Sequence, residues 1–218
     1  MNGKIFAIGD IHGCSAKLSL LLERLPFDPR HDTLVFLGDY LDRGPQVKEV
    51  LDQICRLRQE GIRIVPLMGN HEYLLLEYHK TGDQALLPYL RGLGLENTLE
   101  SYGGASLSQL TALTFMPPEH RAFLNALLPY WETEEYIFVH AGLRQNQSLA
   151  DQDISDLCEI REPFLSTEIN YGKRVIFGHN AFATPLVTPF RIGIDTGATY
   201  GNLLTAVELP NLRFYHAA

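Results

Sequence analysis

The 218-residue sequence predicts an α/β fold in one domain, residues 1–218. Two patterns support this prediction. Short apolar, β-rich runs alternate with helical patterns in the first third of the chain, and further strand-like runs fill the last part. Each early run ends in a polar loop that contains glycine, and open α/β sheets carry their sites at the carboxyl ends of strands. The length is typical of a single domain.

The first strand–loop–helix unit begins near the N-terminus. Lys4 to Ile8 is an apolar run that we expect to be a strand, and it leads into the loop Gly-Asp-Ile-His-Gly at 9–13. The segment from Ser15 to Leu25 predicts a helix, because its leucines recur at helical spacing and Pro26 follows it.

The same pattern recurs along the next stretch of the chain. Thr33 to Leu37 is expected to be a strand leading into Gly-Asp-Tyr-Leu-Asp-Arg-Gly at 38–44. Val47 to Gln59 has apolar side chains at helical spacing, so it predicts a helix. Ile62 to Met68 is the third expected strand, and Gly-Asn-His-Glu at 69–72 stands at its end.

The region from Thr81 to Tyr130 has a different character, with several glycines between short apolar runs. A helix from about Pro118 to Leu128 is expected, because proline is favoured at the first helical position. We interpret residues 81–130 as a helical insertion over or beside the site. A plain structural connector remains an equal alternative.

The last part of the chain predicts mainly strands. Pro210-Asn211 is typical of a hairpin turn between the final two. Two further motifs, His-Ala-Gly-Leu at 140–143 and Gly-His-Asn at 178–180, each follow one of the runs. The expected strands are Tyr136 to Val139, Arg174 to Phe177, Arg191 to Ile194, Leu203 to Glu208 and Leu212 to Tyr215.

Composition excludes several classes of protein. The formal net charge of -8 argues against a nonspecific nucleic-acid binder. The three cysteines show no Cys-x-x-Cys spacing, which favours free thiols in a reducing compartment. No secretory signal is evident, and no segment approaches the roughly 20 apolar residues of a membrane span. We expect a cytoplasmic monomer with neither nucleic acid nor membrane as a partner.

Polar side chains follow five of the expected strands. One histidine after a strand is usually a hydrogen-bonded core residue, but five such motifs are hard to explain by packing. Carboxylate, amide and imidazole groups gathered at strand ends can hold hard or borderline metal ions. The set therefore predicts a two-metal hydrolytic site, with the candidates Asp10, His12, Asp39, Asn70, His140 and His179.

The five motifs, in this order, resemble the motif series of the PPP-type phosphoprotein phosphatases, within the calcineurin-like metallophosphoesterase superfamily. The short chain is similar to the compact bacterial and phage branch, exemplified by bacteriophage lambda phosphatase. The resemblance runs from Gly9 to Asn180. It implies a four-layer α/β/β/α sandwich with two mixed sheets and the metals at one edge.

The resemblance also implies how the ligands are shared. Asp39 would bridge two ions, and a hydroxide between the ions would attack the phosphoryl group directly. Manganese is our choice from the bacterial and phage branch, while iron or zinc also suits nitrogen and oxygen ligands. The first ion would be held by Asp10, His12 and Asp39, and the second by Asp39, Asn70, His140 and His179.

Further catalytic residues follow from the same resemblance. Arg43 and Arg161 match phosphate clamps, and Asn70 would also contact the phosphate. His71 matches the general acid, and Asp42 the carboxylate that orients and charges it. The alternatives are a salt bridge at a helix start for Arg43, a surface or structural role for Arg161, and turn capping for Asp42.

Three functions compete. We favour a serine/threonine protein phosphatase acting on phosphorylated proteins or peptides, because Asp42 and Glu72 look more like that branch. The alternative is a dinucleoside polyphosphate hydrolase of the diadenosine tetraphosphatase type, which shares the metal ligands. A metal-binding scaffold without activity is disfavoured, since every ligand and clamp is present. The chain departs from the family pattern at Asn180, where many relatives have Thr.

Overall fold

A computed structural model describes residues 3–218. Its first sheet has five strands in the order β10-β9-β1-β2-β3, and β1, β2 and β3 run parallel. The C-terminal strand β9 pairs antiparallel with both β1 and β10. The bounds are Ile5–Ile8 for β1, Thr33–Phe36 for β2, Ile64–Pro66 for β3, Leu204–Leu209 for β9 and Arg213–Ala217 for β10.

The second sheet also has five strands, in the order β4-β5-β6-β8-β7. Its three central strands are parallel, and the two edge strands are antiparallel to their neighbours. Both edge strands are short and do not stand out in the sequence. The bounds are Tyr130–Glu132 for β4, Tyr136–Val139 for β5, Arg174–Phe177 for β6, Leu186–Val187 for β7 and Arg191–Gly193 for β8.

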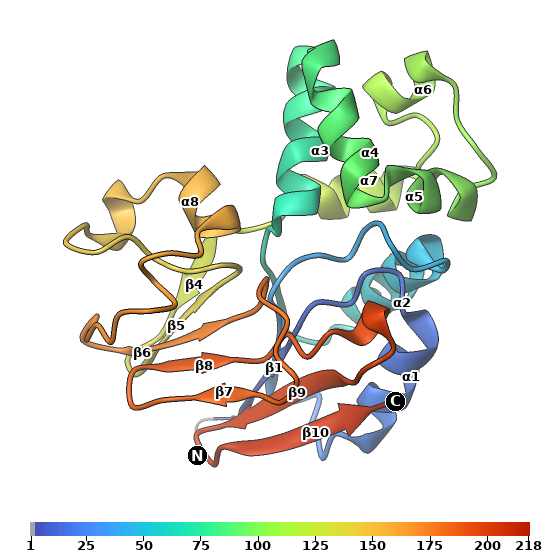
Figure 1. The fold of residues 1–218 in the computed structure, drawn as a ribbon. Helices are drawn as coiled ribbons and strands as arrows, with labels where there is room; N and C mark the ends of the chain where they lie inside the picture. The colour runs from blue at the N-terminus through green and yellow to red at the C-terminus, as the bar shows by residue number, and fades with distance from the viewer. Residues whose placement is uncertain (1–2) are drawn as a thin grey trace.

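The two sheets pack against each other, and helices lie along the outer side of the first sheet (Figure 1). Side chains alternate along β1, so Ala7 lies with Phe138 and Ile176 between the sheets, whereas Phe6 packs toward the helices. Helices α1 (Ser15–Arg24) and α2 (Val47–Gln59) cover the first sheet, and α8 (Ile154–Glu159) contributes to the apolar cluster outside the second. The predicted four-layer sandwich with two mixed sheets is confirmed.

A group of helices stands at one end of the molecule (Figure 1). Helix α3 packs against α4 and α6, while α5 and α7 pack against α2. The sequence predicts the start of α7 at Pro118, but this helix ends at Leu124 and not at Leu128. Helices α4, α5 and α6 have only 6 or 7 residues each and are separated by glycines, so the sequence does not predict them one by one. The group comprises α3 (Asn70–Thr81), α4 (Leu87–Leu93), α5 (Leu95–Ser101), α6 (Leu107–Ala112) and α7 (Pro118–Leu124). Three single-turn 3₁₀ segments complete the fold: η1 (Gln84–Leu86), η2 (Leu149–Asp151) and η3 (Ala198–Tyr200).

None of the helices within residues 3–218 combines the length and the apolar character that a membrane crossing requires.

Candidate metal centre

The five sequence motifs meet at the carboxyl ends of β1, β2, β5 and β6 and at the start of α3. Backbone hydrogen bonds join the first two loops, where the N–H of His12 donates to the carbonyl of Asp39 at 2.8 Å. The N–H of Gly178 donates in the same way to the carbonyl of His140, also at 2.8 Å. A Cβ on Gly69 would lie 2.1 Å from Asp39 Oδ1, so only glycine permits this approach.

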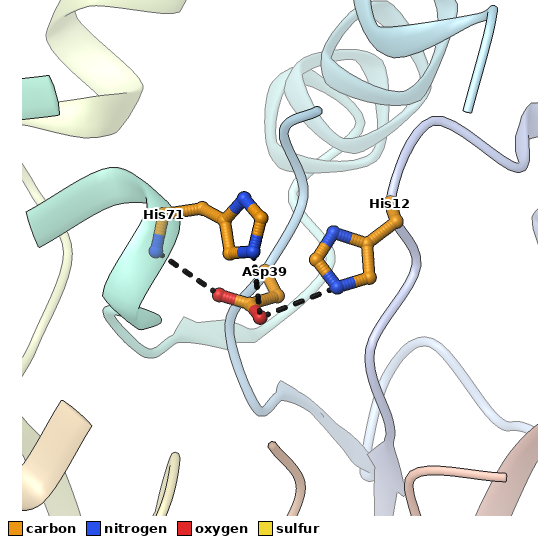
Figure 2. Close-up of side chains that lie close together, drawn as sticks. All are labelled: His12, Asp39 and His71. Carbon is orange, nitrogen blue, oxygen red and sulfur yellow. Dashed lines mark hydrogen bonds and ion pairs between the residues drawn. The ribbon is translucent and has the colours of Figure 1, made fainter. Parts of the chain in front are cut away.

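Asp39 lies at the centre of the cluster (Figure 2). Its Oδ2 is 3.3 Å from His12 Nε2 and 3.8 Å from His71 Nε2, and its Oδ1 is 3.4 Å from His140 Nε2. Burial by itself would raise the pKa of this carboxyl, but the three imidazoles outweigh burial and hold the pKa well below its usual range.

Backbone carbonyls orient two of the imidazoles. His12 Nδ1 lies 2.8 Å from the carbonyl of Leu41, and His140 Nδ1 lies 2.8 Å from the carbonyl of Leu37. A carbonyl only accepts, so each Nδ1 carries the proton and each Nε2 presents a lone pair toward Asp39. This arrangement is the usual support for a metal-binding histidine.

The residues fit two cations that share Asp39. Two groups of ligand atoms, each within 4.8 Å of one another, come from His12, Asp39 and His71 and from Asp39, His140 and His179. The buried Nε2 of His179 has no hydrogen-bond partner in the described chain. Burial, reinforced by the neighbouring His140, lowers the pKa of His179 to about 3, so its imidazole is neutral and able to bind a metal.

Asp10 is placed differently from the other predicted ligands. It belongs to neither group, and its Oδ2 accepts a hydrogen bond of 2.9 Å from the backbone N–H of His179. Burial and the charges of Asp195 and Asp39 raise the pKa of Asp10 well above its usual range. A bound cation would relieve this repulsion, and metal ligation by Asp10 remains a prediction.

Asn70 begins α3 instead of ending a strand, and its Oδ1 lies 3.3 Å from His140 Nε2. The helix starts here because Glu72 turns back to accept a hydrogen bond from the N–H of Gly69 at 3.1 Å, as in a capping box. The same carboxylate accepts from the N–H groups of Asp39, Tyr40 and Leu41 at 2.9 to 3.1 Å. Glu72 therefore ties the loop after β2 to the start of α3.

His71 and Asp42 form a buried pair beside this cluster. His71 Nδ1 lies 2.7 Å from Asp42 Oδ2, so its Nε2 faces Asp39. Burial lowers the pKa of His71, but the charges of Asp39 and Asp42 more than offset it, and the pKa is raised. The hydroxyl of Thr98 on α5 donates to Asp42 Oδ1 at 2.5 Å and accepts from the N–H of Asp42 at 2.9 Å.

The two predicted phosphate clamps approach from different loops. Arg43 is half-buried, and its Nη1 donates to His12 Nε2 at 3.0 Å. Arg161 is exposed, and its Nη1 donates to Asn180 Oδ1 in the loop that carries His179. Asn180, which departs from the family pattern, therefore holds a predicted clamp beside a predicted ligand.

The backbone at the centre is strained. Within residues 3–218 few non-glycine residues have positive φ, and they include many of the candidate site residues. Such conformations are costly, and they cluster at functional sites. The site residues concerned are His12 (44°), Asp39 (51°), Asp42 (64°), Arg43 (63°) and His179 (63°).

Sequence reasoning misses Thr98 and Asp195. Thr98 lies 56 residues from its partner Asp42, and no local pattern announces the contact. Asp195 is buried near the site and raises the pKa of Asp10. Asp195 directly follows the expected strand Arg191 to Ile194, and the same strand-end rule would have singled it out.

Full-length relatives are named for a nucleotide substrate. The chain is 28% identical over 229 residues to a bis(5'-nucleosyl)-tetraphosphatase PrpE (asymmetrical) of Anoxybacillus flavithermus. The aligned region covers 94% of this chain and 90% of the relative. This similarity contradicts the expectation of a phosphorylated protein as partner, and it does not support a place beside lambda phosphatase. The motifs mislead because metal ligands and phosphate clamps recognise a phosphoryl group whatever molecule carries it.

Solved structures show the same fold. A crystal structure of a candidate diadenosine tetraphosphatase superposes with a TM-score of 0.75 and 24% identity, covering 100% of this chain and 94% of that one. A serine/threonine phosphatase from Saccharomyces cerevisiae superposes with a TM-score of 0.60 and 16% identity, over 95% and 73%. The model of the calcineurin-like phosphoesterases matches residues 3–182. The chain therefore belongs to the calcineurin-like phosphoesterase family, whose members are metal-dependent hydrolases.

Proposed function

We propose that this protein hydrolyses dinucleoside polyphosphates, and that it cleaves a bis(5'-nucleosyl) tetraphosphate asymmetrically into a nucleoside triphosphate and a nucleoside monophosphate. The observation that carries the proposal is the full-length similarity to the asymmetrical enzyme of Anoxybacillus flavithermus. The buried cluster around Asp39 supports it, because its ligand groups suit a pair of divalent ions.

Two divalent ions, when bound, would activate a water molecule and neutralise charge on the phosphate. His12, Asp39, His140 and His179 would hold them, together with the predicted ligands Asp10 and Asn70. Manganese remains our proposal for the metal. The protein contributes a buried set of ligands that is already oriented. Backbone carbonyls orient the imidazoles of His12 and His140, and Glu72 holds the loop that bears Asp39 by a hydrogen bond.

Arginine side chains would hold the polyphosphate chain. Arg43 donates to His12 Nε2, and occupation of that nitrogen by a metal would free its guanidinium for phosphate oxygens. Arg161, steadied by Asn180, would bind phosphate from the other loop. A planar guanidinium suits this task because it can donate two parallel hydrogen bonds to one phosphate.

His71 would donate a proton to the leaving oxygen. Its Nδ1 is held by Asp42, which leaves the proton on Nε2 directed toward the cluster. The raised pKa of His71 favours the protonated form near neutral pH. A nucleotide leaving group is a weaker base than a serine alkoxide, so this proton is less critical for a polyphosphate than for an alkyl ester.

The test is product analysis. Protein loaded with Mn²⁺ is incubated with diadenosine tetraphosphate, and the nucleotides are separated by ion-exchange chromatography. Equal amounts of ATP and AMP are expected, and the variant Asp39→Asn should release neither. ADP as the sole product would contradict asymmetrical cleavage, and the absence of any nucleotide product from the loaded protein would overturn the proposal.

A further inference from the structure

An exposed aromatic ring stands beside the metal centre. Tyr200 is 66% exposed, and the centre of its ring lies 5.5 Å from the guanidinium carbon of Arg43. Arg43 in turn reaches His12 Nε2 at 3.0 Å. One side chain therefore separates this ring from the ligands of the candidate site.

The turn that carries the ring is well ordered by its hydrogen bonds. Gly197 and Gly201 flank η3 with φ of 72° and 86°, which lets the chain turn tightly at both ends. The N–H of Tyr200 donates to the carbonyl of Gly197 at 2.9 Å. Lys17 Nζ donates to the carbonyl of Ala198 at 3.1 Å. The aromatic ring of Tyr200 is thus exposed to solvent on a turn that hydrogen bonds stabilise.

This turn also lies next to the loop that carries His179. The side chain of Asn202 donates to the carbonyl of Ala183 at 3.2 Å, and the N–H of Phe182 donates to the carbonyl of Asp195 at 3.0 Å. The turn that carries Tyr200 is therefore hydrogen-bonded to the loop after β6. The Tyr200 ring itself lies against Arg43, which belongs to the loop after β2. A substrate phosphate held by Arg43 would bring its attached nucleoside close to this ring.

We propose that Tyr200 is a stacking platform for one nucleobase of the substrate, next to the phosphate held by Arg43. The proposal rests on the proposed function. Bases stack on tyrosine rings and on arginine planes, and stacking accepts any base because each has a π face. Adenine and guanine nucleotides should therefore bind with similar affinity.

The test compares two ligands that share a diphosphonate and differ by a nucleoside. Calorimetry on Mn²⁺-loaded protein gives the Kd of adenosine 5'-(α,β-methylene)diphosphate and of methylenediphosphonate. Tyr200→Ala should weaken the nucleotide about ten-fold, the scale expected for one stacked base, and leave methylenediphosphonate within two-fold. Tyr200→Trp should retain the nucleotide affinity. Tyr89→Ala, which removes a 67% exposed tyrosine on α4, should change neither Kd.

The outcomes separate stacking from other roles. Equal weakening of both ligands by Tyr200→Ala would mean that the ring only positions Arg43, and unchanged nucleotide affinity would mean that no base rests on it. Either result would overturn the proposal. The binding measurement needs no turnover, so a failure to cleave diadenosine tetraphosphate would count against the proposed function alone.

Discussion

His71 faces two partners, and its position allows two roles. Its Nδ1 is bound to Asp42, while its Nε2 lies 3.8 Å from Asp39 Oδ2 and within the first group of ligand atoms. A metal ligand and a general acid need the same nitrogen, so one residue cannot serve both roles at once. Asp42 favours the acid, because a carboxylate on the far nitrogen raises the pKa of the imidazolium.

Replacement of His71 distinguishes these roles. His71→Asn should keep both metals bound and lower kcat for glycerol phosphate by about 100-fold or more, the usual contribution of a general acid. The loss for diadenosine tetraphosphate should be about ten-fold, since its leaving group is a weaker base. Metal analysis and steady-state kinetics measure both. Loss of a metal ion with equal losses on the two substrates would instead identify His71 as a ligand.

Among the elements, α5 contributes directly to the site through Thr98. Its hydroxyl and the N–H and carboxylate of Asp42 form a closed pair of hydrogen bonds in a fully buried place. We therefore propose that the helical region at about 81–130 serves to orient the His71–Asp42 pair. This function would explain why the region packs on α2 and α3.

Thr98→Val tests this function. Loss of the hydroxyl leaves buried polar atoms of Asp42 unpaired, which should lower the free energy of unfolding by about 1–3 kcal/mol. Misorientation of His71 should lower kcat about ten-fold. Denaturant titration and kinetics give both values, and Thr114→Val on an exposed position is the control. Wild-type kcat in a destabilised Thr98→Val protein would show that α5 supports only the fold.

A second contact joins α7 to α2. His120 is buried, with Nε2 3.0 Å from Asp52 Oδ1 and Nδ1 2.7 Å from the hydroxyl of Tyr102. Burial lowers the pKa of His120, although the charges of Asp52 and Glu119 oppose the change. The unfolded chain therefore takes up a proton at a higher pH than the folded one, and protonation favours unfolding.

The contribution of His120 to stability should thus be present above its ordinary pKa of about 6.5 and be lost as the pH falls below it. Denaturant titrations at pH 7 and pH 5 give the free energy of unfolding at each pH. Its decrease from pH 7 to pH 5 should be smaller in His120→Gln than in the wild type. The same drop in both proteins would contradict this assignment.

At the scale of the whole molecule, local patterns reveal the centre but not its surroundings. Asp39 and His140 follow strongly apolar strands, so the sequence predicts that each lies at a strand end. The two strands belong to different sheets, and the proximity of the two side chains depends on how the sheets pack. The contact of Thr98 with Asp42 is not predicted from the sequence, because it depends on how short helices pack. The edge strands β4 and β7 are too short, at 3 and 2 residues, to produce a period. The sequence does not predict the substrate either, since the motifs specify the phosphoryl bond that is cut and not the molecule that contains it.

The central claim is that two ions sharing Asp39 drive hydrolysis of a dinucleoside polyphosphate. The most direct test is a Mn²⁺ titration of metal-free protein, with bound metal and diadenosine tetraphosphate hydrolysis measured on the same samples. Activity should be absent without metal and should saturate at two ions per chain, while Asp39→Asn should neither bind two ions nor turn over substrate. Full activity in metal-free protein, or in Asp39→Asn, would contradict the claim.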